Sequence, residues 1–80
     1  MGWGRIILQL KYIQILESII NNSEYNIKTI CDIGCGDWEF SQFINFGDKE
    51  YLGIDCVNYI IKINQDKYKK ENIKFEHKIV

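Results

Sequence analysis

The sequence contains no proline and no alanine, and its 80 residues carry a formal net charge of only −1. A charge so close to zero gives no electrostatic footprint for nucleic acid, whose phosphates are bound by basic surfaces. No apolar run exceeds three residues, which excludes a membrane span, because a transmembrane helix needs about 20 apolar residues. A chain of this length forms one small domain that buries about 60–65% of its unfolded surface, so we expect marginal stability.

The sequence is also poor in metal ligands, with three cysteines and one histidine. The spacing Cys31-x3-Cys35-x20-Cys56, with His77 downstream, matches no paired-ligand zinc pattern, and we predict no metal site. Cys31 and Cys56 stand in apolar stretches, where a free cysteine packs as a small hydrophobic residue. His77 has no evident acid or base partner, so we expect it to be structural. The odd cysteine count without a secretion signal indicates a reducing, cytoplasmic location.

What the sequence does contain is a regular alternation of helical and strand patterns, which predicts an α/β fold with a parallel sheet and right-handed crossovers. We expect a three-layer, Rossmann-like partial sheet of strand order 3-2-1 with flanking helices. It forms a single partial domain over residues 1–80. The predicted elements are a helix over 5–21, a strand over 27–33, a helix over 38–46, a strand over 50–56, a helix over 58–70 and a strand over 73–80.

The three predicted helices each have one apolar face. The first could serve core packing or, as a weaker alternative, lie on a membrane surface, although its polar face has only one lysine. The second begins at the N-cap candidate Asp37, and its aromatic residues favour a core over a substrate-stacking role. In the third, an excess of lysines over acids indicates a solvated face more than a phosphate-binding patch. The inward positions are Ile6, Leu10, Ile13, Leu16 and Ile20, then Phe40, Phe43 and Ile44, then Ile60, Ile61 and Ile63.

Two acids stand at the ends of neighbouring predicted strands, and a glycine turn follows the first of them. The first segment reads Asp32-Ile33-Gly34-Cys35-Gly36, and the second ends at Asp55. Glycines let the backbone approach a ligand closely, and a carboxylate at the next strand end can hold a ribose diol. Asp32 could alternatively be a helix cap or an ion-pair partner. Together these features predict a site for a nucleoside-type cofactor.

The turn does not fit the common nucleotide fingerprints. A dinucleotide site asks for a third glycine at position 39, where Glu39 would repel a pyrophosphate. A phosphate loop needs Gly-Lys-Ser/Thr, and the sequence has none. The fold class therefore fits a Rossmann-like protein, but NAD does not fit the turn.

The turn and the second acid instead resemble two motifs of class I S-adenosylmethionine-dependent methyltransferases. Asp32-Ile33-Gly34-Cys35-Gly36 is similar to the first motif and Tyr51-Leu52-Gly53-Ile54-Asp55 to the second. The longer run Gly-Cys-Gly-Asp-Trp, together with Gly2-Trp3-Gly4, resembles a bacterial and phage-type subgroup. The resemblance extends over nearly the whole chain, but only to the cofactor-binding front half of the family domain.

The resemblance implies S-adenosylmethionine as the cofactor and assigns a role to each matching residue. Asp32 would anchor the methionine portion, through its ammonium and a water. Gly34, Cys35 and Gly36 would lie under the methionine and ribose. Asp55 would bind both ribose hydroxyls, an arrangement that suits an acceptor-only carboxylate. Cys56 and Val57 would pack against the adenine.

The sequence departs from the family pattern in two places and leaves the acceptor open. Trp38 stands where many members have a third glycine, and residues 77–80 lack the acid that often contacts the adenine amino group. The methyl acceptor and the catalytic residues stay unassigned. We expect a truncated, catalytically incomplete methyltransferase half, or alternatively a non-catalytic Rossmann-like binding module or enzyme remnant. The unpaired edge of the first strand invites self-association or a partner chain.

Overall fold

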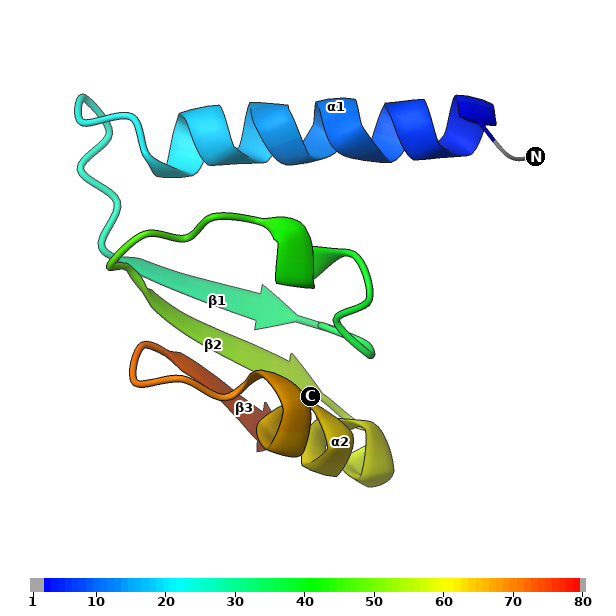
Figure 1. Ribbon diagram of the computed structural model, residues 1–80. Coiled ribbons are helices and arrows are strands. Elements are labelled where there is room, and N and C mark those ends of the chain that lie inside the picture. Colours follow the sequence, from blue (N-terminus) through cyan, green and yellow to red (C-terminus); the bar gives the residue numbers. More distant parts are fainter. Residues whose placement is uncertain (1–2, 80) are drawn as a thin grey trace.

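The computed structural model describes the backbone of residues 3–79 and the side chains of residues 10–79. A long N-terminal helix is followed by three strands, with one short 3₁₀ turn and one further helix between them (Figure 1). The elements are α1 (Trp3–Ile20), β1 (Thr29–Ile33), η1 (Ser41–Phe43), β2 (Glu50–Asp55), α2 (Asn58–Tyr68) and β3 (Ile73–His77). No helix in the described part of the chain is long and apolar enough to cross a membrane.

The three strands form one parallel sheet, which confirms the predicted α/β class. The hydrogen-bonded order is β1-β2-β3, whereas the sequence predicts the order 3-2-1. Both lists place β2 between the other strands and differ only in the edge from which the strands are counted. Asp32 pairs with Gly53, and Asp55 pairs with His77, so the polar residues of the predicted site lie toward the same, carboxyl edge of the sheet.

The expected three layers are not found, because the described helices and the loop around η1 pack into one core on one face of the sheet. That core includes residues from α1, the loop, β2, α2 and β3, namely Ile13, Ile20, Trp38, Ile44, Phe46, Tyr51, Ile61, Ile73 and Phe75. The other face has exposed side chains at Cys31 in β1 and at Lys74 and Glu76 in β3. Among residues 10–79 no helix covers this face, so the described fold has two layers.

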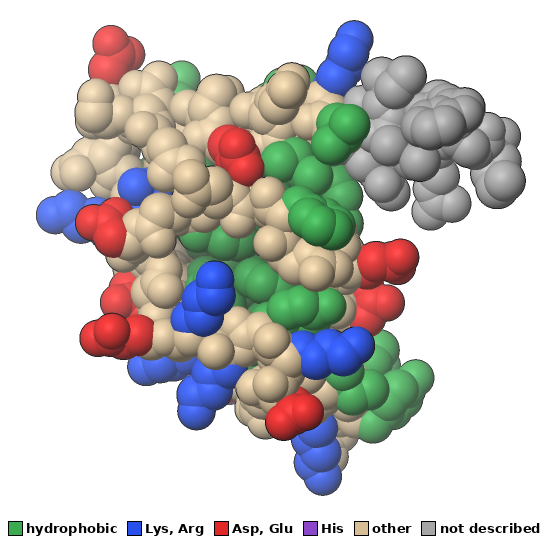
Figure 2. Space-filling model, in the orientation of Figure 1, with side chains coloured by type: hydrophobic (Ala, Val, Ile, Leu, Met, Phe, Trp, Pro, Cys, Tyr) green, Lys and Arg blue, Asp and Glu red, His purple; other side chains and the backbone are tan. Residues whose placement is uncertain are grey.

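Helix α1 contributes to the core through the predicted stripe only in part. Ile13 and Ile20 are buried and Leu16 packs against them, but Leu10 is 55% exposed. The side chain of Ile6 lies outside the described residues. In Figure 2, hydrophobic side chains are visible between α1 and the sheet, and lysines gather toward α2 and β3. Among the described side chains of α1, the apolar stripe therefore packs into the core through Ile13, Leu16 and Ile20.

The predicted helix over residues 38–46 is wrong, because only the 3₁₀ turn η1 forms there. Trp38 has a φ of 64°, in the left-handed region, so a right-handed helix cannot start at this residue. The Asp37 carboxylate accepts a hydrogen bond from the Glu39 amide at 3.0 Å, which makes a local turn instead of a helix cap. Of the predicted inward positions, Ile44 is buried and Phe40 packs against the core, whereas Phe43 is 67% exposed.

Helix α2 matches its prediction in position but differs in its inward face. Val57 is the N-cap residue, and its side chain makes no capping hydrogen bond. Ile61 is buried as predicted, but Ile63 is 44% exposed. The second fully buried side chain of α2 is Asn64, a polar residue that the apolar pattern did not single out.

Candidate functional site

The glycine turn after β1 folds back onto the end of β2. The backbone amides of Gly34 and Cys35 both donate to the carbonyl of Ile54, at 2.7 and 3.0 Å. Gly34 and Gly36 have φ values of 80° and 60°, which L side chains rarely adopt. A Cβ atom placed on either glycine would meet no protein atom within 4 Å. The backbone conformation therefore favours glycine, and the space beside the turn is open to a ligand.

Asp55 is held in place by this same turn. One carboxylate oxygen accepts a hydrogen bond from the Val57 amide at 2.9 Å, and the other accepts from the Gly36 amide at 3.0 Å. The Val57 amide, followed by that of Gly36, holds the pKa of the Asp55 carboxyl below its usual value. Each oxygen has a further acceptor position, so the ionised carboxylate can still accept two hydroxyl donors from a diol. The structure thus brings Asp55 and the turn together as the sequence predicted.

Asp32 lies on the core face of β1 and has a partner that the sequence analysis missed. The Tyr51 hydroxyl donates to Asp32 Oδ2 at 2.7 Å, and the same hydroxyl accepts from Trp38 Nε1 at 2.8 Å. Asp32 therefore neither caps a helix nor forms an ion pair at this oxygen. The period-2 pattern of β2 could have shown that Tyr51 lies on the core face with Asp32, but not that their polar atoms meet.

Cys35 lies between the two acids and packs directly over β2. A Cβ atom on Gly53 would lie 3.0 Å from the Cys35 sulfur and 2.9 Å from the Phe75 ring, so glycine at position 53 makes room for the Cys35 side chain. Burial, with the charges of Asp32 and Asp55, raises the pKa of the Cys35 thiol to about 11. The thiol is therefore neutral at pH 7 and is a spacer, not a nucleophile.

Asn64 connects α2 to the same turn. Its Nδ2 donates to the carbonyl of Gly36 at 2.7 Å, and the side chain is fully buried. With the Asp55 contact, both backbone groups of Gly36 are thus satisfied by side chains from different elements. No sequence motif identified Asn64, although a lone polar residue within an apolar helical stripe is a signal that could have found it.

The residues expected at the adenine end are more exposed than predicted. Cys56 is exposed and Val57 is half-buried, and Cys31 is exposed as well. Cys31 and Cys56 are therefore not packed as core residues, because neither the uncovered sheet face nor the end of β2 has a covering element in the described part of the chain. His77 Nε2 donates to the Cys56 carbonyl at 3.1 Å.

The glycine turn lines two cavities. One of about 160 Å³ is lined by Asp55, Cys56 and Lys78 as well as Gly34. The other, of about 430 Å³, lies between α1, β1 and the η1 loop, and Asp32 and Cys35 are on its wall. Gly34 lines both cavities, so a ligand that reached from Asp55 to Asp32 would pass over the turn.

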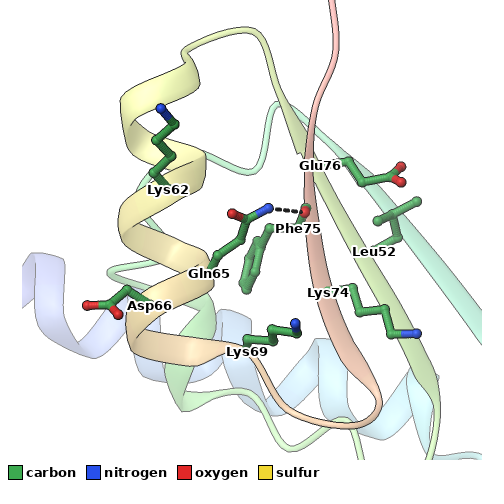
Figure 3. Close-up of a pocket in the computed structure, with 8 residues that line it drawn as sticks. All are labelled: Leu52, Lys62, Gln65, Asp66, Lys69, Lys74, Phe75 and Glu76. Atoms are coloured by element: carbon green, nitrogen blue, oxygen red, sulfur yellow. Dashed lines mark hydrogen bonds between the residues drawn. The ribbon is translucent and has the colours of Figure 1, made fainter.

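A larger cavity of about 770 Å³ lies away from the turn, between α2 and β3 (Figure 3). Its wall has mixed charge, including Lys62, Lys69 and Asp66. Gln65 reaches across from α2 and donates to the carbonyl of Phe75 at 2.9 Å, while Asp66 points away from the strand. This contact satisfies a backbone carbonyl of the edge strand β3. The cavity shows no convergent polar groups, so we place the candidate site at the glycine turn.

No group of three histidine, cysteine or acidic side chains is placed to hold a metal ion among the described residues. Comparison of the chain with protein-family models and with curated proteins gives no match.

Proposed function

We propose that this chain binds S-adenosylmethionine as the front half of a class I methyltransferase domain. The observation that carries the proposal is the Asp55 carboxylate, whose two oxygens are held by the amides of Val57 and Gly36 beside an open glycine turn. A fixed, ionised carboxylate next to exposed backbone suits a ribose diol. A lone Gly-x-Gly would be weak support, but here the turn and the acid position each other.

The other matching residues fit the remainder of the cofactor. Asp32 lines the larger of the two cavities at the turn, where a cationic ammonium would meet a carboxylate. Gly34 lies between the cavities and offers no side chain to block a ligand. Cys56 lines the smaller cavity beside Asp55, and Val57 follows it, which suits contact with a purine. When bound, the cofactor supplies an electrophilic methyl group on a sulfonium.

We further propose that these 80 residues bind the cofactor and do not transfer its methyl group alone. The thiol nearest the turn, Cys35, is held neutral and half-buried, so it offers neither a base nor a nucleophile at pH 7. The acceptor and its catalytic groups are left unassigned. A reducing, cytoplasmic location is part of the proposal, since all three cysteines are free.

Calorimetric titration of the purified chain with S-adenosylhomocysteine tests the proposal. We expect saturable binding that Asp55→Ala abolishes or weakens at least tenfold, which is about 1.4 kcal/mol. Asp66→Ala is the matched control, because this acid lies in α2 at the distant cavity, and it should bind like the unaltered chain. Absence of binding by a folded chain would refute the proposal.

A non-catalytic Rossmann-like interaction module is the second candidate. The uncovered sheet face and the outer edge of β1 favour it, because both present apolar or unpaired groups, including Ile33 at 66% exposure. Such a module needs no cofactor. Folded protein that binds no S-adenosylhomocysteine but associates through β1 would favour this candidate.

A further inference from the structure

Three side chains form a hydrogen-bonded relay that leads from the core to the candidate site. Trp38 Nε1 donates to the Tyr51 hydroxyl at 2.8 Å, and that hydroxyl donates to Asp32 Oδ2 at 2.7 Å. The direction of the relay is fixed by chemistry. An indole N–H is only a donor, so the Tyr51 oxygen must accept from it and has its single proton left for Asp32.

Packing holds the relay rigidly. Tyr51 is 3% exposed and Trp38 is 5% exposed. Their rings lie 5.3 Å apart, and Phe46 packs against both, at 4.8 Å from the Tyr51 ring and 5.9 Å from the Trp38 ring. Burial and the hydrogen bond to Asp32 raise the pKa of Tyr51, so its proton stays in place at any ordinary pH.

The relay ends at a residue that is not part of this buried cluster. Asp32 is half-buried and lines the cavity of about 430 Å³ beside the glycine turn. Only Oδ2 is engaged by Tyr51, so Oδ1 can accept a hydrogen bond from a ligand. A phenylalanine at 51 would fill the core equally well, and the hydroxyl is needed only for the contacts to Trp38 and Asp32.

We propose that Tyr51, oriented by Trp38, is a positioning residue that directs the Asp32 carboxylate toward the cationic amino-acid end of the bound cofactor. This inference rests on the proposed function and names how one part of that site is built. The hydrogen bond that Tyr51 donates fixes the plane of the Asp32 carboxylate. Because donor and acceptor roles along the relay are all assigned, each bond strengthens the next.

The test compares two ligands in the variant Tyr51→Phe. S-adenosylhomocysteine carries the amino-acid end, whereas 5′-methylthioadenosine has the nucleoside and the sulfur without it. The measured quantity is the ratio of their Kd values by calorimetry. A destabilised variant weakens both ligands by the same folded fraction, so that fraction cancels in the ratio. We expect the preference for S-adenosylhomocysteine to fall about tenfold, the size of one charge-assisted hydrogen bond.

Ile61→Val is the matched control, because it removes packing from the same core, while Ile61 lines neither cavity at the turn and makes no hydrogen bond to the relay. It should lower stability and leave the ligand preference unchanged. Asp32→Asn should lose at least as much of this preference as Tyr51→Phe, because it removes the charge that the cationic end meets. Adding Tyr51→Phe to Asp32→Asn should lose no more, since Tyr51 acts through Asp32.

The outcomes separate the relay from the proposed function. If the unaltered chain binds neither ligand, the proposed function fails and the relay with it. If the chain binds both but Tyr51→Phe keeps the preference, the relay is overturned and the proposed function stands. An equal loss of preference in Ile61→Val would likewise show that core packing, and not the Tyr51 hydroxyl, sets the position of Asp32.

Discussion

The side-chain amide of Asn64 donates a 2.7 Å hydrogen bond to the carbonyl of Gly36, which links the middle of α2 to the glycine turn. The amide of the same glycine donates to Asp55. The turn is therefore held from two sides, by a helix and by the end of a strand. Since Asn64 is fully buried, its contact with Gly36 is shielded from competing water, and we expect it to contribute to stability as well as to the shape of the site.

Replacement of Asn64 should destabilise the fold and loosen the turn. Asn64→Ala removes the amide donor of the Gly36 carbonyl and leaves only the weak contact from the Cys35 thiol at 3.6 Å. We expect a loss of about 1–3 kcal/mol in the free energy of unfolding. Asn64→Asp should cost more at neutral pH, because a carboxylate would face that carbonyl in a buried position. Urea unfolding followed by circular dichroism measures both.

Lys62→Ala serves as the control for these variants, because Lys62 is an exposed residue of the same helix and should change stability by no more than about 0.5 kcal/mol. If Asn64→Ala were as stable as Lys62→Ala, the hydrogen bond from Asn64 to Gly36 would not contribute to the free energy of unfolding.

The protonation of Cys35 predicts a loss of stability at alkaline pH. Burial raises the pKa of this thiol from 9.0 to about 11, so between these values the unfolded chain releases the proton while the folded chain keeps it. The contribution of the protonated Cys35 thiol to the free energy of unfolding is therefore fully present below pH 9 and is lost as the pH rises toward 11. Thermal unfolding should be measured over pH 7–11 for the unaltered chain and for Cys35→Ala. The Tm of the unaltered chain should fall more steeply with pH than the Tm of the variant.

Cys31→Ala is the control for the alkaline titration, since Cys31 is exposed, and it should follow the unaltered chain. If the Tm of the unaltered chain and that of Cys35→Ala fell in parallel with pH, the raised pKa of the Cys35 thiol would be contradicted. Lysines and tyrosines also titrate in this range, which is why the difference between the two curves, and not either curve alone, is the measured quantity.

The glycine turn and Asp55 were predictable from the sequence because the features that form them are local. Gly34 and Gly36 stand in a turn where positive φ is needed, and Asp55 ends the next strand, so parallel pairing brings them to one edge. The residues that hold this site were not predictable in the same way. Tyr51 and Asn64 occupy positions on the apolar faces of β2 and α2. Their hydrogen bonds to Asp32 and Gly36 join different elements, and residue spacing in the sequence does not predict such contacts.

The predicted helix over residues 38–46 and the predicted third layer were wrong because both depend on contacts between elements. The residues after Asp37 have a helical apolar spacing, but the left-handed Trp38 places its ring in the core and stops the helix before it starts. Tertiary packing therefore overrode a local pattern. The third layer was expected from the near-continuous apolar end of β1, yet Cys31 and Ile33 are exposed on the open face, because a strand's pattern indicates burial without supplying the element that would cover it.

The outer edge of β1 predicts self-association of the chain. The carbonyl of Lys28 and the amide of Gly34 bond to β2, so by the alternation of a parallel ladder Thr29, Cys31 and Ile33 direct their backbone groups outward. The opposite edge is different, because Gln65 satisfies the Phe75 carbonyl of β3 there. We expect two chains to pair their β1 strands antiparallel, with Cys31 of each at the two-fold axis.

Sedimentation equilibrium over a range of concentrations measures this association. Ile33→Lys should abolish the dimer, since a lysine on an edge strand opposes pairing. Ile79→Lys is the control, because this residue is 86% exposed but lies outside the strands. Mild oxidation gives a second measurement: paired Cys31 residues lie at a Cα separation of about 5.5 Å, which suits a disulfide. A chain that stays monomeric, or cross-linking through Cys56 in place of Cys31, would show that the β1 edge is not the contact.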